Sequence, residues 1–394
     1  MPAIARIAEL ADEFKNIRHY FHQYPELSDY EVKTADKIAH YLESWGIEVH
    51  RNENDTGLVG VLKNGQSSKS IALRADMDAL AIEEANQFAH ASKNKGVMHA
   101  CGHDGHITTL LLAARYLAET KKFDGTVYFL FQSAEENSHG AVAMLKNRVF
   151  ERFPADYVFG CHNWPDTPNK KVGINRRALM ASGNEFTIEV QGRGSHGALP
   201  NLSIDPIFVA VQIYNALQGI VTRMKRPIDP AVMSVCQIVS GTTYNVVPNT
   251  AKLVGTIRTF DHNVTVMMHK EMEKIAQSVA AAFGATASVN FNYLIPPLIN
   301  HEKCSDMVAE VAKELFGEDA LHEQEPVMPS EDFGCYLEHC PGAFFFLGNG
   351  KGEHRAQGHG SGPCALHNAS YDFNDDLLEI GASIFAGLVE KHLR

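Results

Sequence analysis

Apolar residues in the first half of the chain alternate between the spacing of helices and that of buried strands. Residues 4–23 carry apolar side chains at helical spacing, and a second helix is expected over residues 31–45, ending at Gly46. Shorter apolar runs predict strands at residues 58–62, 71–75, 126–132 and 157–160, with helices at residues 107–118 and 140–146. This alternation predicts an α/β fold with a mostly parallel sheet covered by helices on both faces.

The pattern changes near residue 182, where a β-α-β-β-α-β order begins. We expect strands at residues 185–191, 231–240, 251–259 and 287–293, with helices at residues 204–221 and 264–283. That order is typical of a ferredoxin-like unit. The α/β pattern resumes after Pro297, with a helix at 305–316, a strand at 343–347 and a helix at 375–393. We therefore expect a ferredoxin-like domain (182–295) inserted between two parts of one α/β domain (1–181 and 296–394).

Composition and charge restrict the class of protein. The 394 residues carry a formal net charge of -12, which argues against a nucleic-acid partner. The N-terminus does not have the pattern of a secretory signal, and no apolar run reaches membrane-spanning length. Seven scattered cysteines favour a reducing compartment over a disulfide framework. The expectation is a cytoplasmic enzyme that does not bind membranes.

Residues 97–106 (VMHACGHDGH) hold one thiol, three imidazoles, one carboxylate and two glycines. These side chains bind borderline-soft divalent metals, and glycine allows a loop to fold tightly around an ion. Cys101 and His103 are two residues apart, so that a strand or a tight loop can direct both at one ion. The alternative is a Cys and a His packed in a core turn. The density of imidazoles favours metal binding.

Further chemistry is expected where the predicted strands end. Glu135 and Glu136 follow the strand at 126–132, and two adjacent carboxylates repel each other unless a cation or proton separates them. Asp76 and Asp78 follow the strand at 71–75, where they could bind metal, orient a ligand imidazole or cap a loop. His162 follows the strand at 157–160. Ligands in α/β sheets bind beyond the carboxyl ends of strands, so one shared site is expected.

Several stretches together resemble the metal-dependent aminoacylase/carboxypeptidase family, in particular its branch of hippurate hydrolases, N-acyl-amino-acid amidohydrolases and plant auxin-conjugate hydrolases. The matching stretches are residues 22–28 (HQYPELS), 73–80 (LRADMDAL), 98–106 (MHACGHDGH), 131–136 (FQSAEE), 160–165 (GCHNWP), 192–196 (GRGSH), 245–248 (NVVP), 255–260 (GTIRTF), 331–333 (EDF) and 366–367 (LH). The sequence departs from the family pattern at Ala81, Ser133 and the Pro329-Ser330 pair, none of which is a catalytic group.

The resemblance implies a metallopeptidase-like catalytic domain with an inserted lid and dimerisation domain. It implies one or two divalent ions (Zn, Mn, Co or Ni) and these ligands: Cys101, His103, Glu136, His162 and His367. Glu135 resembles the general base, with Asp76 and Asp78 in supporting positions. In the lid, His196 resembles a histidine that stabilises the oxyanion, often in the partner subunit's site. Asn245 and Arg258 resemble residues that bind the substrate carboxylate.

The implied reaction is hydrolysis of an N-acyl-L-amino acid, in which Glu135 takes a proton from a metal-activated water and passes it to the leaving amine. A close alternative on the same site is a dipeptidase or carboxypeptidase, because these enzymes and the amidohydrolases all cleave an amide beside a free carboxylate. A different class is a thiol hydrolase with Cys101 as the nucleophile, and a third is a non-catalytic protein with a relict site. His196 could instead be a turn residue, and Arg258 a member of a surface ion pair.

Overall fold

The computed structural model describes residues 4–394, which divide into two compact units. Residues 1–3, which belong to the N-terminus that lacks the pattern of a secretory signal, lie outside the described residues. The first unit comprises Met1–Leu179, Ile299–Glu325 and Asp332–Arg394, and the second comprises Met180–Leu298 and Pro326–Glu331. The chain passes between the units in β7 (Ala178–Met180), in β14 (Leu298–Ile299) and on both sides of residues 326–331.

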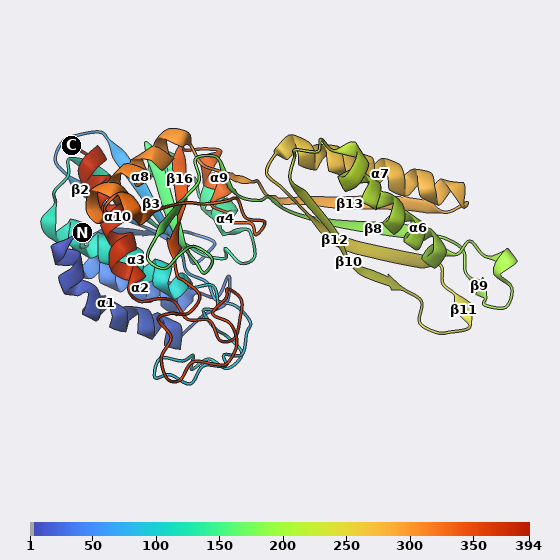
Figure 1. Ribbon diagram of the computed structural model, residues 1–394, viewed down its shortest axis with the longest axis horizontal. Helices are drawn as coiled ribbons and strands as arrows, with labels where there is room; N and C mark the ends of the chain where they lie inside the picture. The colour runs from blue at the N-terminus through green and yellow to red at the C-terminus, as the bar shows by residue number, and fades with distance from the viewer. Residues whose placement is uncertain (1–3) are drawn as a thin grey trace. The chain divides into compact units, whose positions relative to one another are not determined.

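An eight-stranded sheet in the order β1-β2-β4-β3-β5-β16-β6-β15 forms the centre of the first unit (Figure 1). Its strands are β1 (Glu48–Arg51), β2 (Leu58–Asn64), β3 (Ser70–Asp76), β4 (Gly125–Gln132), β5 (Tyr157–Trp164), β6 (Val172–Ile174), β15 (Leu321–Glu323) and β16 (Gly342–Gly348). The four central strands pair in parallel, whereas β1, β2 and β4 pair antiparallel towards one edge, as do β16 and β6 towards the other. Every residue of β3 and β16 is buried, which explains their continuous apolar runs. The predicted α/β fold is confirmed.

Helices pack on this sheet through the apolar positions that the sequence repeats at helical spacing. α3 packs against β3, and α1 and α10 pack against α3. The helices of the unit are α1 (Ala5–Gln23), α2 (Val32–Ser44), α3 (His103–Thr120), α4 (Gly140–Lys146), α5 (Val149–Arg152), α8 (Glu302–Phe316), α9 (Gly334–Leu337) and α10 (Leu377–His392). In residues 4–394, no helix is both long and apolar enough to span a membrane.

Two elements extend further than their apolar pattern predicts. α3 begins at His103 rather than near residue 107, because its first turn consists of His, Asp and Gly and carries no apolar periodicity. β5 continues to Trp164 rather than ending at residue 160, so His162 lies within the strand. The polar residues of this extension are buried, which a sequence pattern based on hydrophobicity cannot indicate.

The second unit has the predicted βαββαβ order, with an antiparallel sheet arranged β10-β12-β8-β13. Its elements are β8 (Gly183–Gln191), β9 (Ser195–His196), α6 (Pro206–Gly219), a π-helical turn (Ile220–Met224), β10 (Ala231–Ser240), β11 (Val246–Val247), β12 (Thr250–Thr259), α7 (His262–Ala282) and β13 (Thr286–Ile295). Along β8, Phe186, Ile188 and Val190 are buried in the core shared with α6 and α7, and the residues between them face away. This alternation is typical of a sheet with one covered face.

A cluster of buried charges joins α1 to the start of α3 and to the segment before α10. The guanidinium of Arg18 is fully buried and lies 3.2 Å from Asp104, 3.0 Å from Asp372 and 2.8 Å from Asp375. One turn further along α1, His22 lies 2.9 Å from Asp104 and 3.1 Å from Glu84. Burial disfavours a charged imidazole, but Asp104 and Glu84 outweigh it and raise the pKa of His22 to about 10.

Replacing His22 by Gln should lower the stability of the first unit by about 3 kcal/mol at neutral pH, because the buried carboxylates lose a charged partner. The unfolded imidazole titrates near pH 6.5 and the folded one near pH 10. The stabilisation is therefore complete below about pH 6.5 and disappears as the pH rises through 10. Urea unfolding of metal-free wild-type and His22→Gln proteins from pH 6 to 10 measures this difference. A difference in unfolding free energy that stays constant from pH 6 to 10 would contradict a positively charged His22 in the folded protein.

Candidate metal centre

Five candidate side chains from the first unit gather where β3, β4 and β5 end and α3 begins. Asp76 is the last residue of β3, Glu135 and Glu136 follow β4, and His162 lies near the end of β5. His103 is the first residue of α3. The carboxyl ends of the parallel strands therefore bring these residues to one edge of the sheet, as the sequence predicts.

Gly102 makes the turn from Cys101 into α3 possible. Its φ of 90° lies in the left-handed region that favours glycine, and a Cβ atom there would lie 2.2 Å from Oδ1 of Asn163. A side chain at this position would thus be strained and would collide with a buried amide. The glycine lets Cys101 and His103, the residues on either side of it, direct their side chains at the same region.

His103 is oriented by Asp78 with one ring nitrogen left available. Its Nδ1 lies 3.1 Å from Oδ1 of Asp78, whereas its buried Nε2 has no hydrogen-bond partner among the described residues. Oε1 of Glu136, also without a partner within residues 4–394, lies 3.9 Å from this Nε2. Buried polar atoms are normally paired, so two such atoms facing each other indicate a place for a ligand.

Cys101, His162 and His367 lie around the same point. Sγ of Cys101 is 3.4 Å from Nε2 of His162, whose Nδ1 is 2.6 Å from the carbonyl oxygen of Asn163. Nε2 of His367 is 3.4 Å from Oε2 of Glu136. The backbone N–H of His367 donates to the carbonyl of Ala100, which attaches its loop beside Cys101.

Several groups of three side chains present ligand atoms within 4.8 Å of one another. Within the first unit these groups are Cys101–His103–His162, Cys101–Glu136–His367, His103–Glu135–Glu136 and Asp76–His103–His106. The first three overlap at Cys101, His103 and Glu136. Thiolate, imidazole and carboxylate donors suit a borderline-soft divalent ion such as Zn, Co or Ni, and the overlap is compatible with one or two ions.

Asp76 and His106 form a buried hydrogen-bond network next to the centre. Oδ1 of Asp76 lies 2.6 Å from Nδ1 of His106, and its Oδ2 accepts from Arg74 at 2.8 Å. Nε2 of His106 is 2.7 Å from Oδ1 of Asn163. Both nitrogens of His106 and both oxygens of Asp76 are therefore engaged in this network. The fourth group of ligand atoms is explained by these contacts without an ion.

The third imidazole of residues 97–106, that of His99, has a different environment from those of His103 and His106. His99 is buried, and neither ring nitrogen has a hydrogen-bond partner among the described residues. Burial lowers its pKa to about 4, so the ring is neutral at physiological pH. The three imidazoles whose density predicts a metal site from the sequence therefore lie in three different environments.

Without a cation, the electrostatics of the centre keep the Cys101 thiol protonated. Burial and the carboxylates of Glu136 and Glu135 raise its pKa well above the ordinary value. A nucleophilic cysteine requires a lowered pKa, so these surroundings count against a metal-free thiol hydrolase. Burial opposes the charged form of His103, but Asp76, Asp78 and Glu136 together raise its pKa to about 10. Positive charge is thus strongly favoured at this point.

The turn that carries Glu135 has an unusual backbone. Ala134 has a φ of 51°, which costs a residue with a Cβ atom about 1 kcal/mol. The turn closes where the Gly140 N–H donates to the Ala134 carbonyl at 3.1 Å. A Cβ atom at Gly140 would lie 1.6 Å from the carbonyl oxygen of Ser133, so only glycine fits there.

The three predicted lid residues belong to the second unit. His196 is exposed in β9, and the Gly197 N–H donates to the carbonyl of Asn245 at 2.8 Å, which makes His196 and Asn245 neighbours. β12 begins at Thr250, five residues after Asn245. Arg258 lies near the end of this strand, where it donates to the carbonyl of Asn184 at 3.3 Å. Thr250 and Arg258 are separated by roughly 25 Å along the strand. One copy of this sheet therefore presents Asn245 and Arg258 at opposite ends.

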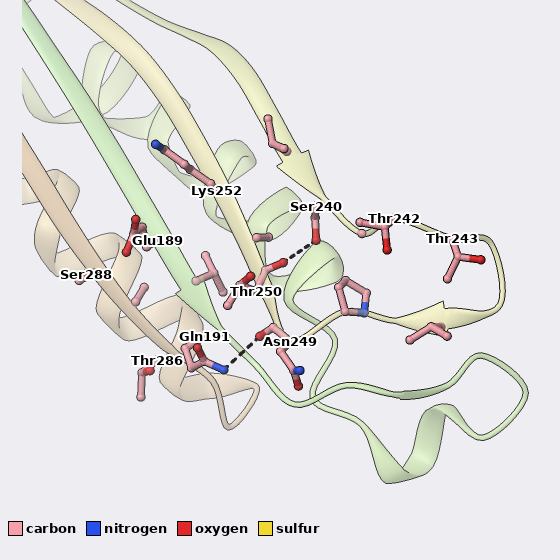
Figure 2. A pocket seen from close by; sticks show the side chains of 17 residues that line it. Glu189, Gln191, Ser240, Thr242, Thr243, Asn249, Thr250, Lys252, Thr286 and Ser288 are labelled. Carbon is pink, nitrogen blue, oxygen red and sulfur yellow. Dashed lines mark hydrogen bonds between the residues drawn. The ribbon is translucent and has the colours of Figure 1, made fainter.

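The uncovered face of the same sheet carries a hollow of about 890 Å³ (Figure 2). Its lining mixes polar and apolar side chains, and hydrogen bonds within it join Ser240 to the carbonyl of Thr250 at 2.6 Å and Gln191 to that of Asn249 at 3.2 Å. Glu189 and Lys252 carry the charges of this lining. A single carboxylate without imidazole or thiol is a poor metal site, so the hollow does not compete with the centre at the sheet edge.

Sequence reasoning assigned no role to several residues that support the centre. Arg74 pairs with Asp76 and, at 3.0 Å, with buried Asp332, which also accepts from Gln132 and from the backbone of Ala141. Glu31 accepts from the backbone N–H of Ala134 at 2.9 Å. Arg74, Gln132 and Asp332 lie inside the family-like stretches, which was the available signal. Glu31 lies just beyond the stretch 22–28. In the sequence it has only the features of an ordinary residue at the start of the helix expected over residues 31–45.

Comparison with known proteins identifies the family. The sequence pattern of peptidase family M20/M25/M40 matches residues 72–391. A hippurate hydrolase of Campylobacter jejuni is 42% identical over 395 aligned residues that cover 100% of both chains, and thermostable carboxypeptidase 1 of Saccharolobus solfataricus is 38% identical, covering 98% of this chain and 96% of its own. A crystal structure from Bacillus subtilis, described as a dinuclear metal binding peptidase from the M20 family, superposes with a TM-score of 0.83 at 31% identity, covering 98% of this chain and 99% of that chain. The chain belongs to peptidase family M20/M25/M40 and is a hydrolase, as the resemblance in the sequence implies.

Divalent metal should bind at the centre and stabilise the first unit. Adding Zn, Mn, Co or Ni to metal-free protein should raise its melting temperature, because an ion that binds only the folded state adds about 2.7 kcal/mol at a hundredfold excess over Kd. Cys101→Ser should weaken the affinity by at least about 100-fold, because a neutral hydroxyl replaces the thiolate ligand. Thermal unfolding measures the rise in melting temperature, and calorimetric titration measures the affinity. Cys161→Ser is the control, because that thiol is buried in the hydrophobic core; equal weakening in both variants would contradict the assignment of Cys101.

Proposed function

We propose that the protein is a metal-dependent amidohydrolase that cleaves the amide bond of N-acyl-L-amino acids, of the hippurate or N-acetyl-amino-acid kind. The observation that carries this proposal is the pair Glu135-Glu136 beside buried thiol and imidazole donors, with Nε2 of His103 and Oε1 of Glu136 directed at a common point. Membership of a hydrolase family and the similarity to a hippurate hydrolase support it.

In this proposal Cys101, His103, Glu136, His162 and His367 hold one or two divalent ions. A bound ion supplies a water of lowered pKa and polarises the amide carbonyl. Zn, Mn, Co and Ni all suit the donor set, and the single thiol favours the softer members of this group. Asp78 holds the Nδ1 proton of His103 so that Nε2 faces the ion, and Asp76 supports the centre through His106.

Glu135 performs the proton transfers. Its carboxylate is buried next to Glu136 and accepts the proton of the attacking water. It then returns this proton to the nitrogen of the leaving amino acid, so that the C–N bond breaks and a neutral amine departs. Burial of the carboxylate excludes competing bulk water, which strengthens its interaction with the reacting atoms.

The lid residues complete the proposed reaction. His196 would donate a hydrogen bond to the oxyanion that develops on the carbonyl oxygen, while Asn245 and Arg258 would bind the carboxylate of the substrate. Because Asn245 and Arg258 occupy opposite ends of one sheet, contact of both with one substrate requires two copies of the second unit. This requirement supports a homodimer that shares its lids.

A dipeptidase or carboxypeptidase activity is the second candidate. It is favoured by the 38% identity to thermostable carboxypeptidase 1 of Saccharolobus solfataricus. Both activities cleave an amide bond next to a free carboxylate with the same proposed residues, so the substrate distinguishes them and the mechanism does not.

Hydrolysis of a substrate panel by metal-loaded protein tests the proposed activity. The panel contains N-acetyl- and N-benzoyl-L-amino acids and dipeptides, and release of free amino acid is measured. Glu135→Gln should reduce kcat by about 10²- to 10⁴-fold, because it removes the general base. The variant should keep the metal-induced rise in melting temperature, since Gln preserves the shape of the side chain. Hydrolysis that persists without metal and in the variant would refute the proposal.

The proposed homodimer should depend on the outer face of α6. Ile207, Phe208, Val211 and Tyr214 are 41%, 49%, 41% and 39% exposed and form one apolar stripe on this helix. Phe208→Glu should convert dimer to monomer in sedimentation velocity, because it buries a charge in the interface. Gln277→Glu, which adds the same charge at an exposed position of α7, is the control. A wild-type protein that sediments as a monomer would contradict the homodimer.

A further inference from the structure

Residues 28–31 precede the span 72–391 that matches the family model, and they are linked to the turn that carries Glu135 and Glu136. Oγ of Ser28 donates to Oδ2 of Asp78 at 2.7 Å. The backbone N–H of Glu136 donates to the same oxygen at 3.0 Å. The segment therefore reaches the turn through Asp78, in addition to the direct contact of Glu31.

Glu31 makes the direct contact with a carboxylate that is 0% exposed. Its Oε1 accepts from the backbone N–H of Ala134 at 2.9 Å, and its Oε2 accepts from Oγ1 of Thr56 at 2.6 Å. Glu31 immediately precedes α2, but its side chain makes no capping hydrogen bond to that helix. The backbone and hydroxyl of Thr34 at the start of α2 donate instead to Glu26. A role in starting α2 therefore does not explain why a carboxylate is buried at Glu31.

The turn itself needs an external anchor. Ala134 has a φ of 51°, which is a strained conformation for a residue with a Cβ atom. Inside the turn, the Ser138 N–H donates to the carbonyl of Glu135 at 2.7 Å and the Gly140 N–H to that of Ala134 at 3.1 Å. These bonds close the turn on itself but leave the Ala134 N–H to Glu31. Strained backbone persists where surrounding contacts hold it.

We propose that Glu31 is a positioning residue for Glu135. Its buried carboxylate holds the amide of Ala134 and thereby sets the point from which the general base projects. Ser28 supplies the second anchor, because Asp78 joins it to the Glu136 amide. The inference rests on the proposed function, in which Glu135 transfers the protons. In this proposal, residues 28–31 contribute to catalysis by holding the turn that carries the general base, and they do not contact the substrate.

Two substitutions at Glu31 separate a geometric role from a role of its charge. Glu31→Gln keeps an oxygen for the Ala134 N–H and a polar group for Thr56, and should retain kcat within about 3-fold. Glu31→Leu fills the same buried volume but leaves the amide unpaired, and should lower kcat by about 10- to 100-fold, the scale of loss for a misplaced catalytic group. KM should change by less than about 2-fold, and bound metal should stay equal to that of the wild type.

Glu26→Ala is the matched control, because this carboxylate lies on the same segment but binds only the start of α2. It should lower the melting temperature while kcat stays within about 2-fold. A Glu31→Leu protein with wild-type kcat overturns the proposal. So does a Glu31→Leu protein that loses metal, or a Glu31→Gln protein as impaired as Glu31→Leu, because these results indicate a merely structural role or a role of charge.

Hydrogen exchange followed by mass spectrometry supplies a readout that needs no substrate. In the wild type, the amides of residues 134–136 should exchange as slowly as those of β4, and Glu31→Leu should accelerate their exchange selectively. Fast exchange in the wild type overturns the proposal even if no variant folds. If the wild type cleaves no N-acyl amino acid or dipeptide while this protection is present, the proposed function fails and the anchoring of the turn by Glu31 stands.

Discussion

Compensation of buried negative charge at one edge of the first unit's sheet is the constraint on which the rest of the structure depends. Asp76, Asp78, Asp104 and Asp332 are all buried there. A buried carboxylate without a partner costs several kcal/mol, so each must be paired or neutralised. The fold meets this requirement with two buried arginines and, for Asp78, with His103 and Ser28. The atoms that remain unpaired mark the candidate metal centre.

The two arginines divide the carboxylates into structural and available groups. Arg18 is paired with Asp104, Asp372 and Asp375, and Arg74 is paired with Asp76 and Asp332. Oε1 of Glu136, in contrast, has no hydrogen-bond partner among residues 4–394. A cation at this point would therefore complete the charge balance. Burial and this same negative charge raise the pKa of the Cys101 thiol when no cation is present.

Backbone geometry and side-chain chemistry are coupled throughout the centre. Gly102 turns the chain into α3 at a φ of 90°, and Ala134 takes a φ of 51° before the two glutamates. His367 also has a positive φ, and its amide is attached to Ala100. Each of these positive-φ positions adjoins or carries a polar side chain that lies at the candidate metal centre. Strain of this kind is retained where surrounding hydrogen bonds determine the conformation, which links the precision of the site to the packing of segments distant in sequence.

The sequence by itself determined the fold class, the order of the main elements and the family, because apolar periodicity and local motifs are recorded within short stretches of chain. It also indicated the strand ends at which Asp76, Glu135 and Glu136 lie. It placed the start of α3 and the end of β5 wrongly, because buried polar residues break the apolar pattern there. Only the tertiary structure decided which of three imidazoles faces the centre, and that Glu31 is next to Ala134 across 103 residues of sequence. Such pairings depend on which segments the fold brings together, and no local pattern of residue types contains that information.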